Sequence, residues 1–125
     1  MKMTPKDTVL SGYKAFADGD MESLGSKFHQ NCVITVNGDH KLSGEYNGFD
    51  NWLSNFLSKI PEVFPNFNLE IVSVTAENER VHVFVHLTAD NLDAYAVHMF
   101  VVEDDLQTEF RIFDDSQKIA AALEG

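Results

Sequence analysis

The chain has 125 residues, a length that suits one domain with a single hydrophobic core, and we expect residues 1–125 to form that domain. Twenty Asp and Glu against nine Lys and Arg give a formal charge of -11, which disfavours binding to nucleic acid and to anionic membranes. The single cysteine, an N-terminus without an apolar leader and the lack of a membrane-length apolar run favour a cytoplasmic protein.

The first residues predict two helices separated by a tight turn. Thr4 is a capping residue, Pro5 suits the first helical position, and apolar residues then recur at helical spacing as far as residue 17. Asp18 and Gly19 end this helix. Asp20 then caps a short second helix.

A short strand pair and a third helix follow. The β-rich segment 32–36 ends in a turn at 37–39, and a short strand at 41–43 is expected to pair with it. Apolar residues at helical spacing then predict a third helix over 49–60, which Pro61 ends.

The C-terminal half predicts an antiparallel meander and a final short helix capped by Asp114 or Asp115. Four strands are expected at 67–76, 80–89, 92–103 and 106–113. Helices followed by such a meander indicate an α+β domain in which the helices cover one face of a strongly bent sheet. This arrangement leaves a concave space between the helices and the sheet.

Two-residue turns at 90–91 and 104–105 predict which side chains share a face of the sheet. This register places His98 opposite Arg111 and Phe100 opposite Glu109. One face is then an apolar pocket wall with a polar island of His98, Glu109 and Arg111, and its other members are Val83, Val85, Ala96, Phe100 and Phe113. The opposite face is too apolar for water and predicts a homodimer interface, formed by Phe84, Val97, Met99, Val101, Phe110 and Ile112.

Three segments, 13–36, 42–57 and 92–115, together resemble the SnoaL-like and ketosteroid-isomerase-like proteins of the nuclear transport factor 2 superfamily. The landmarks are Gly19-Asp20, the G-x-Y-x-G of Gly44, Tyr46 and Gly48, and the acidic pair Asp114-Asp115. The resemblance implies a cone-shaped half-barrel, also called cystatin-like, with a curved antiparallel sheet around about three helices. It also implies a pocket and, commonly, a homodimer. This fold hosts isomerases, cyclases, dehydratases and non-catalytic binders, so it does not give the function.

The catalytic set of the steroid isomerases is absent from the matching positions. That reaction needs a carboxylate base, a Tyr and a protonated Asp. The base position holds Val36, the Asp position holds Ala96, and the Tyr position in the first helix falls on Gly12. A supporting Tyr in the third helix is replaced by Phe56.

The candidate catalytic residues are therefore His98 and Glu109, with Arg111 as a ligand anchor. A His of near-neutral pKa can transfer a proton, a carboxylate can orient it, and Arg can hold a ligand oxygen. The alternative is that Glu109 and Arg111 form a structural ion pair. Further ligand-binding candidates from the helices are Tyr13, Phe16, Trp52 and Phe56.

Other polar residues are assigned structural roles. His82 and His86 lie too far apart along a strand to share a metal, and the sequence shows no zinc motif or phosphate loop, so neither a metal nor a cofactor is expected. His40 is expected in a surface loop, and Asp114 and Asp115 are expected to cap the last helix.

The sequence thus predicts a pocket for a small, largely apolar molecule with one polar or anionic group. One hypothesis is an enzyme that performs acid–base isomerisation, cyclisation or dehydration. The alternatives are a ligand-binding protein without chemistry and an interaction module that uses its outer sheet face.

Overall fold

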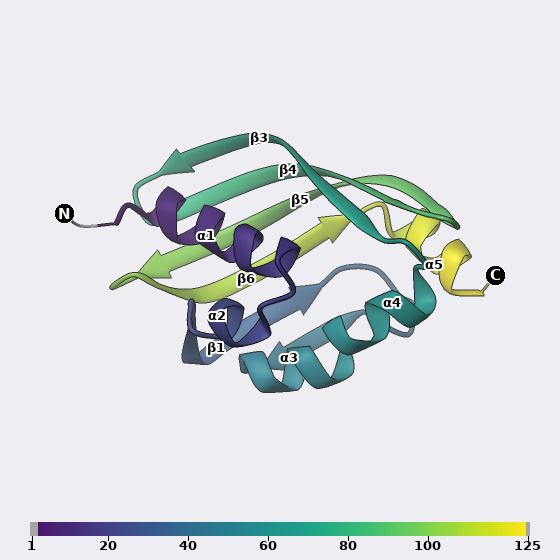
Figure 1. The fold of residues 1–125 in the computed structure, drawn as a ribbon, viewed down its shortest axis with the longest axis horizontal. Helices are drawn as coiled ribbons and strands as arrows, with labels where there is room; N and C mark the ends of the chain where they lie inside the picture. Colours follow the sequence, from purple (N-terminus) through teal and green to yellow (C-terminus); the bar gives the residue numbers. More distant parts are fainter. Residues whose placement is uncertain (1–2, 125) are drawn as a thin grey trace.

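The computed structural model describes residues 3–124 and shows an α+β fold in which helices cover one face of a curved sheet (Figure 1). The six strands are arranged in the order β2-β1-β6-β5-β4-β3, and only β1 and β6 run parallel among the neighbouring pairs. The helices are α1 (Pro5–Ala17), α2 (Met21–Gly25), α3 (Phe49–Asn55), the 3-10 turn η1 (Leu57–Lys59), α4 (Ile60–Val63) and α5 (Ser116–Glu124). The strands are β1 (Phe28–Val36), β2 (Gly44–Asn47), β3 (Asn68–Glu77), β4 (Arg80–Ala89), β5 (Leu92–Glu103) and β6 (Leu106–Asp114). The predicted fold class is confirmed.

Helix α1 begins as its sequence predicts. The Thr4 hydroxyl accepts a hydrogen bond from the Asp7 amide, the Asp7 carboxylate accepts one from the Thr4 amide, and Pro5 occupies the first turn. This reciprocal pair satisfies two amides that a helix start leaves without partners.

Two predictions for the middle of the chain are wrong. The strand expected at 41–43 begins only at Gly44, because His40 and Ser43 close a loop in which each amide bonds an oxygen of the other residue. The helix expected over 49–60 is broken into α3, η1 and α4. Pro61 cannot donate to a preceding carbonyl, and it is accommodated only because a new helix starts there.

The pairing of β5 with β6 differs from the predicted register by one residue. Asp104 and Asp105 form the expected two-residue turn with positive φ, and Glu103 pairs with Leu106. Val102 then pairs with Gln107 but Val101 pairs with Glu109, so Thr108 is an extra residue in a β-bulge. A one-residue shift moves every later side chain to the other face.

The bulge reverses the predicted positions of five side chains. Phe110 and Ile112, predicted on the outer face, are 4% and 5% exposed and belong to the core. Glu109, Arg111 and Phe113, predicted on the pocket wall, lie on the outer face, where Phe113 is 48% exposed. His98 is opposite Ile112, and Phe100 is opposite Phe110.

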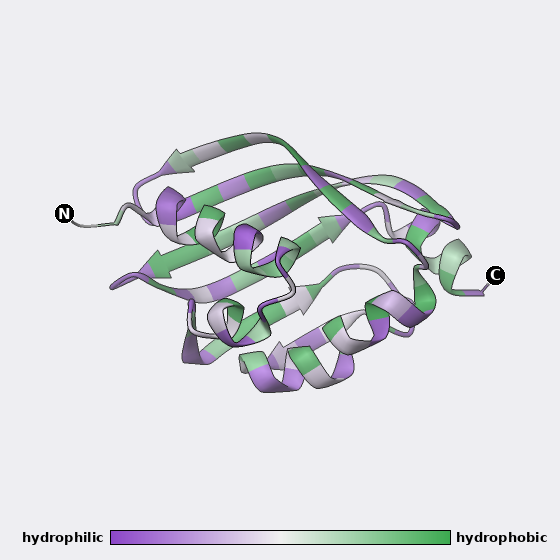
Figure 2. Ribbon diagram, viewed as in Figure 1, coloured by the Kyte–Doolittle hydropathy of each residue, from purple (hydrophilic) through white to green (hydrophobic). Residues whose placement is uncertain are grey.

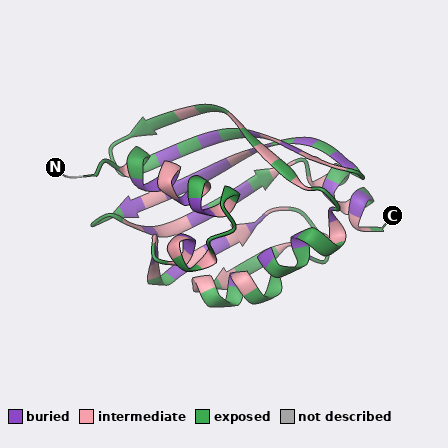
Figure 3. Cartoon of the chain, viewed as in Figure 1, coloured by how far each residue is buried: buried purple, intermediate pink, exposed green. Residues whose placement is uncertain are grey.

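The core fills the space between the inner face of the sheet and the helices. Buried and exposed residues alternate along β4, where Val81, Val83 and Val85 are fully buried (Figure 3). Apolar residues alternate with polar ones in the same strands (Figure 2). Helix α1 packs on strands β3 to β6, and α3 packs on β1 and β2. No helix within residues 3–124 combines the length and the apolar character that crossing a membrane requires.

Candidate functional site

A cavity of about 100 Å³ lies between the helices and the inner face of the sheet. Helices α1 and α3 and strands β5 and β6 all contribute to its wall. The wall is mainly apolar, and its aromatic members are Tyr13, Phe16, Phe28, Trp52, Phe56, Phe64, Phe67, Phe100 and Phe110. The cavity is much smaller than the roughly 300–1,000 Å³ of pockets for drug-sized ligands, so as it stands it accepts only a compact group.

The structure divides the predicted site residues into three groups. Those that line the cavity are Tyr13, Phe16, Trp52, Phe56, His98 and Phe100. Val83, Val85 and Ala96 are buried in the same sheet face but are not part of the cavity wall. Glu109, Arg111 and Phe113 lie on the opposite face of the sheet, so their predicted placement in the pocket is wrong.

Glu109 and Arg111 pair with each other on this outer surface. The Arg111 Nε donates to the Glu109 Oε2 over 2.5 Å, with about half of the Arg111 side chain exposed. An exposed pair contributes little to stability, because water screens it and two long side chains must be ordered. Arg111 therefore cannot anchor a ligand in the cavity.

His98 reaches the cavity from β5 and is bonded to Tyr13 of α1. The Tyr13 hydroxyl lies 2.5 Å from the His98 Nδ1, and the two rings stack. Burial lowers the pKa of His98 to about 3 and raises the pKa of Tyr13 well above its ordinary value. The proton therefore stays on Tyr13, whose hydroxyl donates to Nδ1, and the neutral His98 ring carries its own proton on Nε2.

This state determines what His98 can do. An imidazole with a pKa of about 3 is a poor general acid or base near neutral pH. It remains a good hydrogen-bond donor through its Nε2 proton. His98 is thus suited to polarise a ligand oxygen rather than to transfer a proton.

Three further residues of the cavity wall each have a buried polar atom with no hydrogen-bond partner among the described residues. These atoms are the Asp114 Oδ1, the His40 Nε2 and the Trp52 Nε1. A buried polar group without a partner costs free energy, on the order of 1–3 kcal/mol each, and such groups are rare. Three such groups belong to residues of one cavity wall, whose accessible surface is almost entirely apolar.

Asp114 reaches the cavity because of the bulge in β6. It pairs with Ala96 of β5, so the two side chains share the inner face. Burial, and next the nearby Asp115 carboxylate, raise the pKa of Asp114 to about 6. Ala96 of β5 occupies the position that matches the acidic donor of the steroid isomerases. In this chain the acidic side chain, Asp114, lies opposite it on β6.

The loop between β1 and β2 brings His40 to the same cavity. The side chain of Asn37 bonds the backbone of Asp114 twice, which ties the start of this loop to the end of β6. Gly38 has a φ of +90° and would place a Cβ 2.6 Å from the Cβ of Ser116, so only glycine fits. The Leu42 amide donates to the His40 Nδ1, which leaves the proton of a neutral His40 on Nε2. Burial lowers the pKa of His40 and favours this neutral form.

Sequence reasoning missed both Asp114 and His40. His40 was expected at the surface but lines the cavity. The expected helix cap is Asp115 alone, whose carboxylate accepts a hydrogen bond from the Lys118 amide. A signal for Asp114 was present, because two adjacent acids at a strand end place one side chain on each face.

The assembled site combines neutral donors with one titratable acid. His40 and Trp52 supply N–H groups, His98 supplies a third, and Asp114 supplies a carboxyl group that can accept or release a proton. Among residues 3–124, no Lys or Arg lines the cavity. Within residues 3–124, no three His, Cys, Asp or Glu side chains are grouped so as to hold a metal ion.

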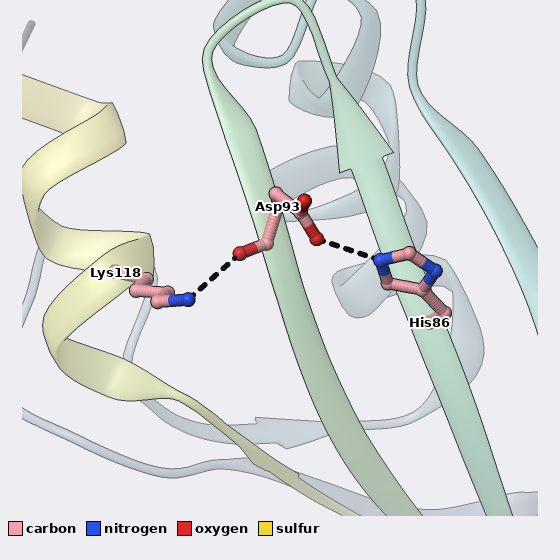
Figure 4. Close-up of polar contacts among 3 residues, drawn as sticks. All are labelled: His86, Asp93 and Lys118. Atoms are coloured by element: carbon pink, nitrogen blue, oxygen red, sulfur yellow. Dashed lines mark hydrogen bonds and ion pairs between the residues drawn. The ribbon is translucent and has the colours of Figure 1, made fainter.

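A second polar cluster lies outside the cavity, on the outer side of β4 and β5 (Figure 4). The His86 Nε2 is 2.6 Å from the Asp93 Oδ1, and Lys118 of α5 donates to the Asp93 carbonyl over 3.1 Å. Tyr95 stacks on His86 with ring centres 4.5 Å apart. The exposed carboxylate and the half-buried imidazole form a surface interaction at the end of the sheet.

Solved structures with the same fold cover almost the whole chain. A nuclear transport factor 2-like protein from Burkholderia thailandensis superposes with a TM-score of 0.89 at 16% identity, over 99% of this chain and 100% of that one. TerC, co-crystallised with polyporic acid, has a TM-score of 0.83 at 22% identity, over 97% and 98% of the two chains. A putative SnoaL-like polyketide cyclase from Jannaschia sp. CCS1 has a TM-score of 0.82 at 20% identity, over 97% and 92%.

A search of curated proteins gave no match. The family model described as SnoaL-like domain matches residues 9–110, from α1 to the middle of β6. These residues include most of the cavity wall, while Ile112, Asp114 and Ile119 lie beyond the match. The chain therefore belongs to the SnoaL-like domain family and has the nuclear transport factor 2-like fold.

Proposed function

We propose that the protein binds a small, neutral, largely apolar molecule through one carbonyl or hydroxyl oxygen and that Asp114 exchanges a proton with it. The observation that carries this proposal is the Asp114 carboxyl group, which lines an apolar cavity with Oδ1 buried and without a partner. Its pKa of about 6 keeps both protonation states accessible near neutral pH.

The cavity wall supports a neutral ligand rather than the anionic one that the sequence suggested. Arg111 lies on the other face of the sheet, and Asp114 is the only formally charged residue among the described lining residues. An anion beside a half-buried carboxylate would meet repulsion without a compensating cation. A neutral carbonyl oxygen instead finds N–H donors.

The chemistry follows from this arrangement. The Asp114 carboxylate takes a proton from the carbon next to a carbonyl, and the electron pair of the C–H bond moves to the oxygen. Donors such as the Nε2 protons of His40 and His98 stabilise the negative charge on that oxygen. Returning the proton to another carbon gives isomerisation. Attack of the enolate carbon on a second carbonyl gives cyclisation, and the oxygen of that carbonyl takes the proton back from Asp114.

The comparisons support a small-molecule ligand. One neighbour is described as a putative SnoaL-like polyketide cyclase and another was co-crystallised with polyporic acid. A second candidate is a binding protein without chemistry, which the apolar wall and the unpartnered donors support equally well. A measurement of catalysed proton exchange distinguishes the enzyme from the binding protein.

Proton exchange tests the proposal without knowledge of the natural substrate. Cyclohexanone in D2O is incubated with the protein, and loss of its α-proton signals is followed by NMR. We expect catalysed exchange that saturates with ketone and falls about 10²–10⁴-fold in Asp114→Asn. If the α-protons exchange no faster than in buffer alone while cyclohexanone still binds saturably, the result would favour the binding protein without chemistry. No binding of any neutral ketone or phenol would contradict the proposed function.

We also propose that the protein is a homodimer through the outer face of the sheet. Four residues of the predicted interface remain on the outer face: Phe84, Val97, Met99 and Val101. The exposed aromatic side chains of this face are Phe84, Tyr95 and Phe113. Phe84 and Tyr95 stack with centres 5.3 Å apart, which makes a flat apolar surface. The cytoplasmic location stays a prediction.

A further inference from the structure

A second hollow lies beside the cavity, on the surface of the molecule. It has a volume of about 1260 Å³ and is bounded by α1, by the segment from η1 to α4, and by the start of β3 (α1, α4 and β3 are labelled in Figure 1). Its own apolar members, which do not reach the cavity, include Leu10, Met21, Leu53 and Ile71, each half-buried. Lys14, Asn66 and Asn68 form part of its polar edge. We call this hollow the groove.

The groove and the cavity are separated by one layer of side chains. Six residues line both spaces: Tyr13, Phe16, Leu57, Ile60, Phe67 and Leu69. Phe16 of α1 and Phe67, which precedes β3, meet edge to face with ring centres 6.3 Å apart. Both are half-buried, and both line the cavity as well as the groove.

The two spaces have complementary chemistry. The cavity is lined by the residues that carry the unpartnered polar atoms, but it has room only for a compact group. The groove has ample volume, and its floor is apolar. Only when the two are joined does one pocket combine the polar residues of the cavity wall with the larger apolar space of the groove.

The backbone that carries Phe67 is held in place, and Phe16 lies within helix α1. Asn66 has a φ of 59°, and its side-chain amide bonds both carboxylate oxygens of Asp90 at 3.2 and 3.0 Å. The Asp90 amide in turn donates to the Pro65 carbonyl over 2.9 Å. These bonds fix the segment before Phe67, so the two spaces can be joined by rotation of the aromatic side chains while the backbone stays in place.

We propose that the binding site has two compartments, with the cavity holding the oxygen-bearing head of a ligand and the groove holding an apolar tail. The tail is a second ring or a short hydrocarbon chain. Phe16 and Phe67 form the gate between the compartments and turn aside when a ligand enters. The chemistry assigned to the ligand head rests on the proposed function, whereas the gate is inferred only from the residues that line both the cavity and the groove.

The gate is tested without any ligand by acrylamide quenching of Trp52, the single tryptophan of the chain, which lines the cavity and is 5% exposed. We expect slow quenching in the wild type and at least about threefold faster quenching in Phe16→Ala and Phe67→Ala, since the wall is opened. The variants Phe16→Leu and Phe67→Leu serve if the alanine variants are unfolded. Phe84→Ala on the outer face is the control and should quench like the wild type. Equal quenching in every folded variant would overturn the gate.

The groove is tested with two neutral probes of different length. Phenol fits a compact head alone, and 4-phenylphenol adds a second ring, so titration of Trp52 fluorescence compares them. We expect 4-phenylphenol to bind at least about tenfold more tightly, because its second ring is buried in the groove. Met21→Asp, a change confined to the groove, should remove this advantage and leave phenol unaffected.

The outcomes separate the two proposals. If phenol binds but the second ring gives no advantage, or if Met21→Asp weakens both probes equally, the two-compartment site is wrong and the proposed function stands. If neither probe binds while Phe16→Ala and Phe67→Ala speed quenching, the gate is supported and the proposed ligand class is wrong. If neither probe binds and quenching is unchanged, the two-compartment site is wrong as well.

Discussion

Burial around one cavity moves the pKa values of two side chains in opposite directions. It raises the pKa of the Asp114 acid to about 6 and lowers the pKa of the His98 base to about 3. The cause is the same in both cases, because a low-dielectric environment disfavours whichever form is charged. Near neutral pH the site therefore contains a neutral imidazole and a carboxyl group close to its titration range.

The first prediction concerns Asp114 and pH. Because its folded pKa of about 6 exceeds the ordinary value of 3.8, the folded protein binds this proton more tightly, and the resulting stability is lost as pH rises from 4 through 6. Asp114→Asn mimics the protonated carboxyl group. We expect it to unfold at a higher urea concentration than the wild type at pH 7.5, and at a similar concentration at pH 4.

This expectation has a clear contrary result. If Asp114→Asn were less stable than the wild type at pH 7.5, the carboxylate would have favourable partners and the argument for a ligand site would fail. Asp50→Asn is the matched control, since Asp50 is exposed and does not line the cavity. It should change stability by less than about 0.5 kcal/mol, with no gain at high pH.

The second prediction concerns the bond between Tyr13 and His98. Tyr13→Phe removes the donor and leaves Nδ1 of a buried imidazole unpaired, which should cost about 1–3 kcal/mol of unfolding free energy. Urea denaturation measures this cost. Tyr95→Phe removes the hydroxyl of a tyrosine that is 52% exposed and should change the free energy by less than about 0.5 kcal/mol.

The same imidazole gives a spectroscopic check. The His98 pKa of about 3 lies below the ordinary 6.5, so the ring stays neutral as pH falls through 6, and the folded state loses stability between 6.5 and 3. Nitrogen-15 NMR should show the Nε2–H tautomer at pH 5. A protonated ring at that pH would contradict the assigned donor role.

At the scale of single elements, the register between β5 and β6 is shifted by Thr108, the extra residue of the β-bulge. Val101 and Val102 pair with residues on either side of Thr108, so its removal leaves a regular ladder with the same faces. Bulges also adjust the local twist, and in β6 the bulge directs Phe110, Ile112 and Asp114 into the interior.

The third prediction compares two single-residue deletions in β6. We expect a chain without Thr108 to fold and to keep Trp52 in a similar near-UV environment, because every later side chain keeps its face. A chain without Arg111 should fail to fold, since Ile112 would move to the outer face and Phe113 inward. Arg111 is itself exposed, so loss of its own contacts would not explain such a failure. Equal tolerance of both deletions would show that the register of β6 is not what fixes its faces.

For the whole molecule, the fourth prediction concerns assembly through the outer sheet face. Sedimentation at micromolar concentration should show a dimer for the wild type and a monomer for Tyr95→Asp or Phe113→Asp, which place unpaired charges on that face. Changing Met99 is a poorer test, because it is 8% exposed within one chain and its loss would disturb the fold. Ser54→Asp on the exposed side of α3 is the control and should remain dimeric.

The charge of the chain adds a second measurement to this test. Each copy carries a formal charge of -11, so two copies repel each other and salt should strengthen the dimer. A monomer at all salt concentrations would show that the apolar outer face serves another partner or none.

The sequence by itself determined the elements whose signals are local. The Thr4 cap of α1, the alternation in β4 and the turn at Asp104-Asp105 each depend on neighbours within a few residues, and each is predicted correctly. The family resemblance determined the fold for the same reason, because its landmarks are short motifs in a fixed order. Tyr13, Trp52 and Phe56 follow helical spacing, which is why they were placed toward the sheet and lie at the cavity wall.

Only the tertiary structure decided which polar residues face the cavity. A bulge at Thr108 leaves no signal in the alternation on either side of it, yet it exchanged Glu109 and Arg111 for Phe110 and Asp114 on the inner face. His40 reached the cavity through the bonds of Asn37 to the end of β6, a contact between segments that lie far apart in the sequence. The pKa values of Asp114 and His98 also depend on burial, which is created by all the packed elements together and is not a property of any single segment.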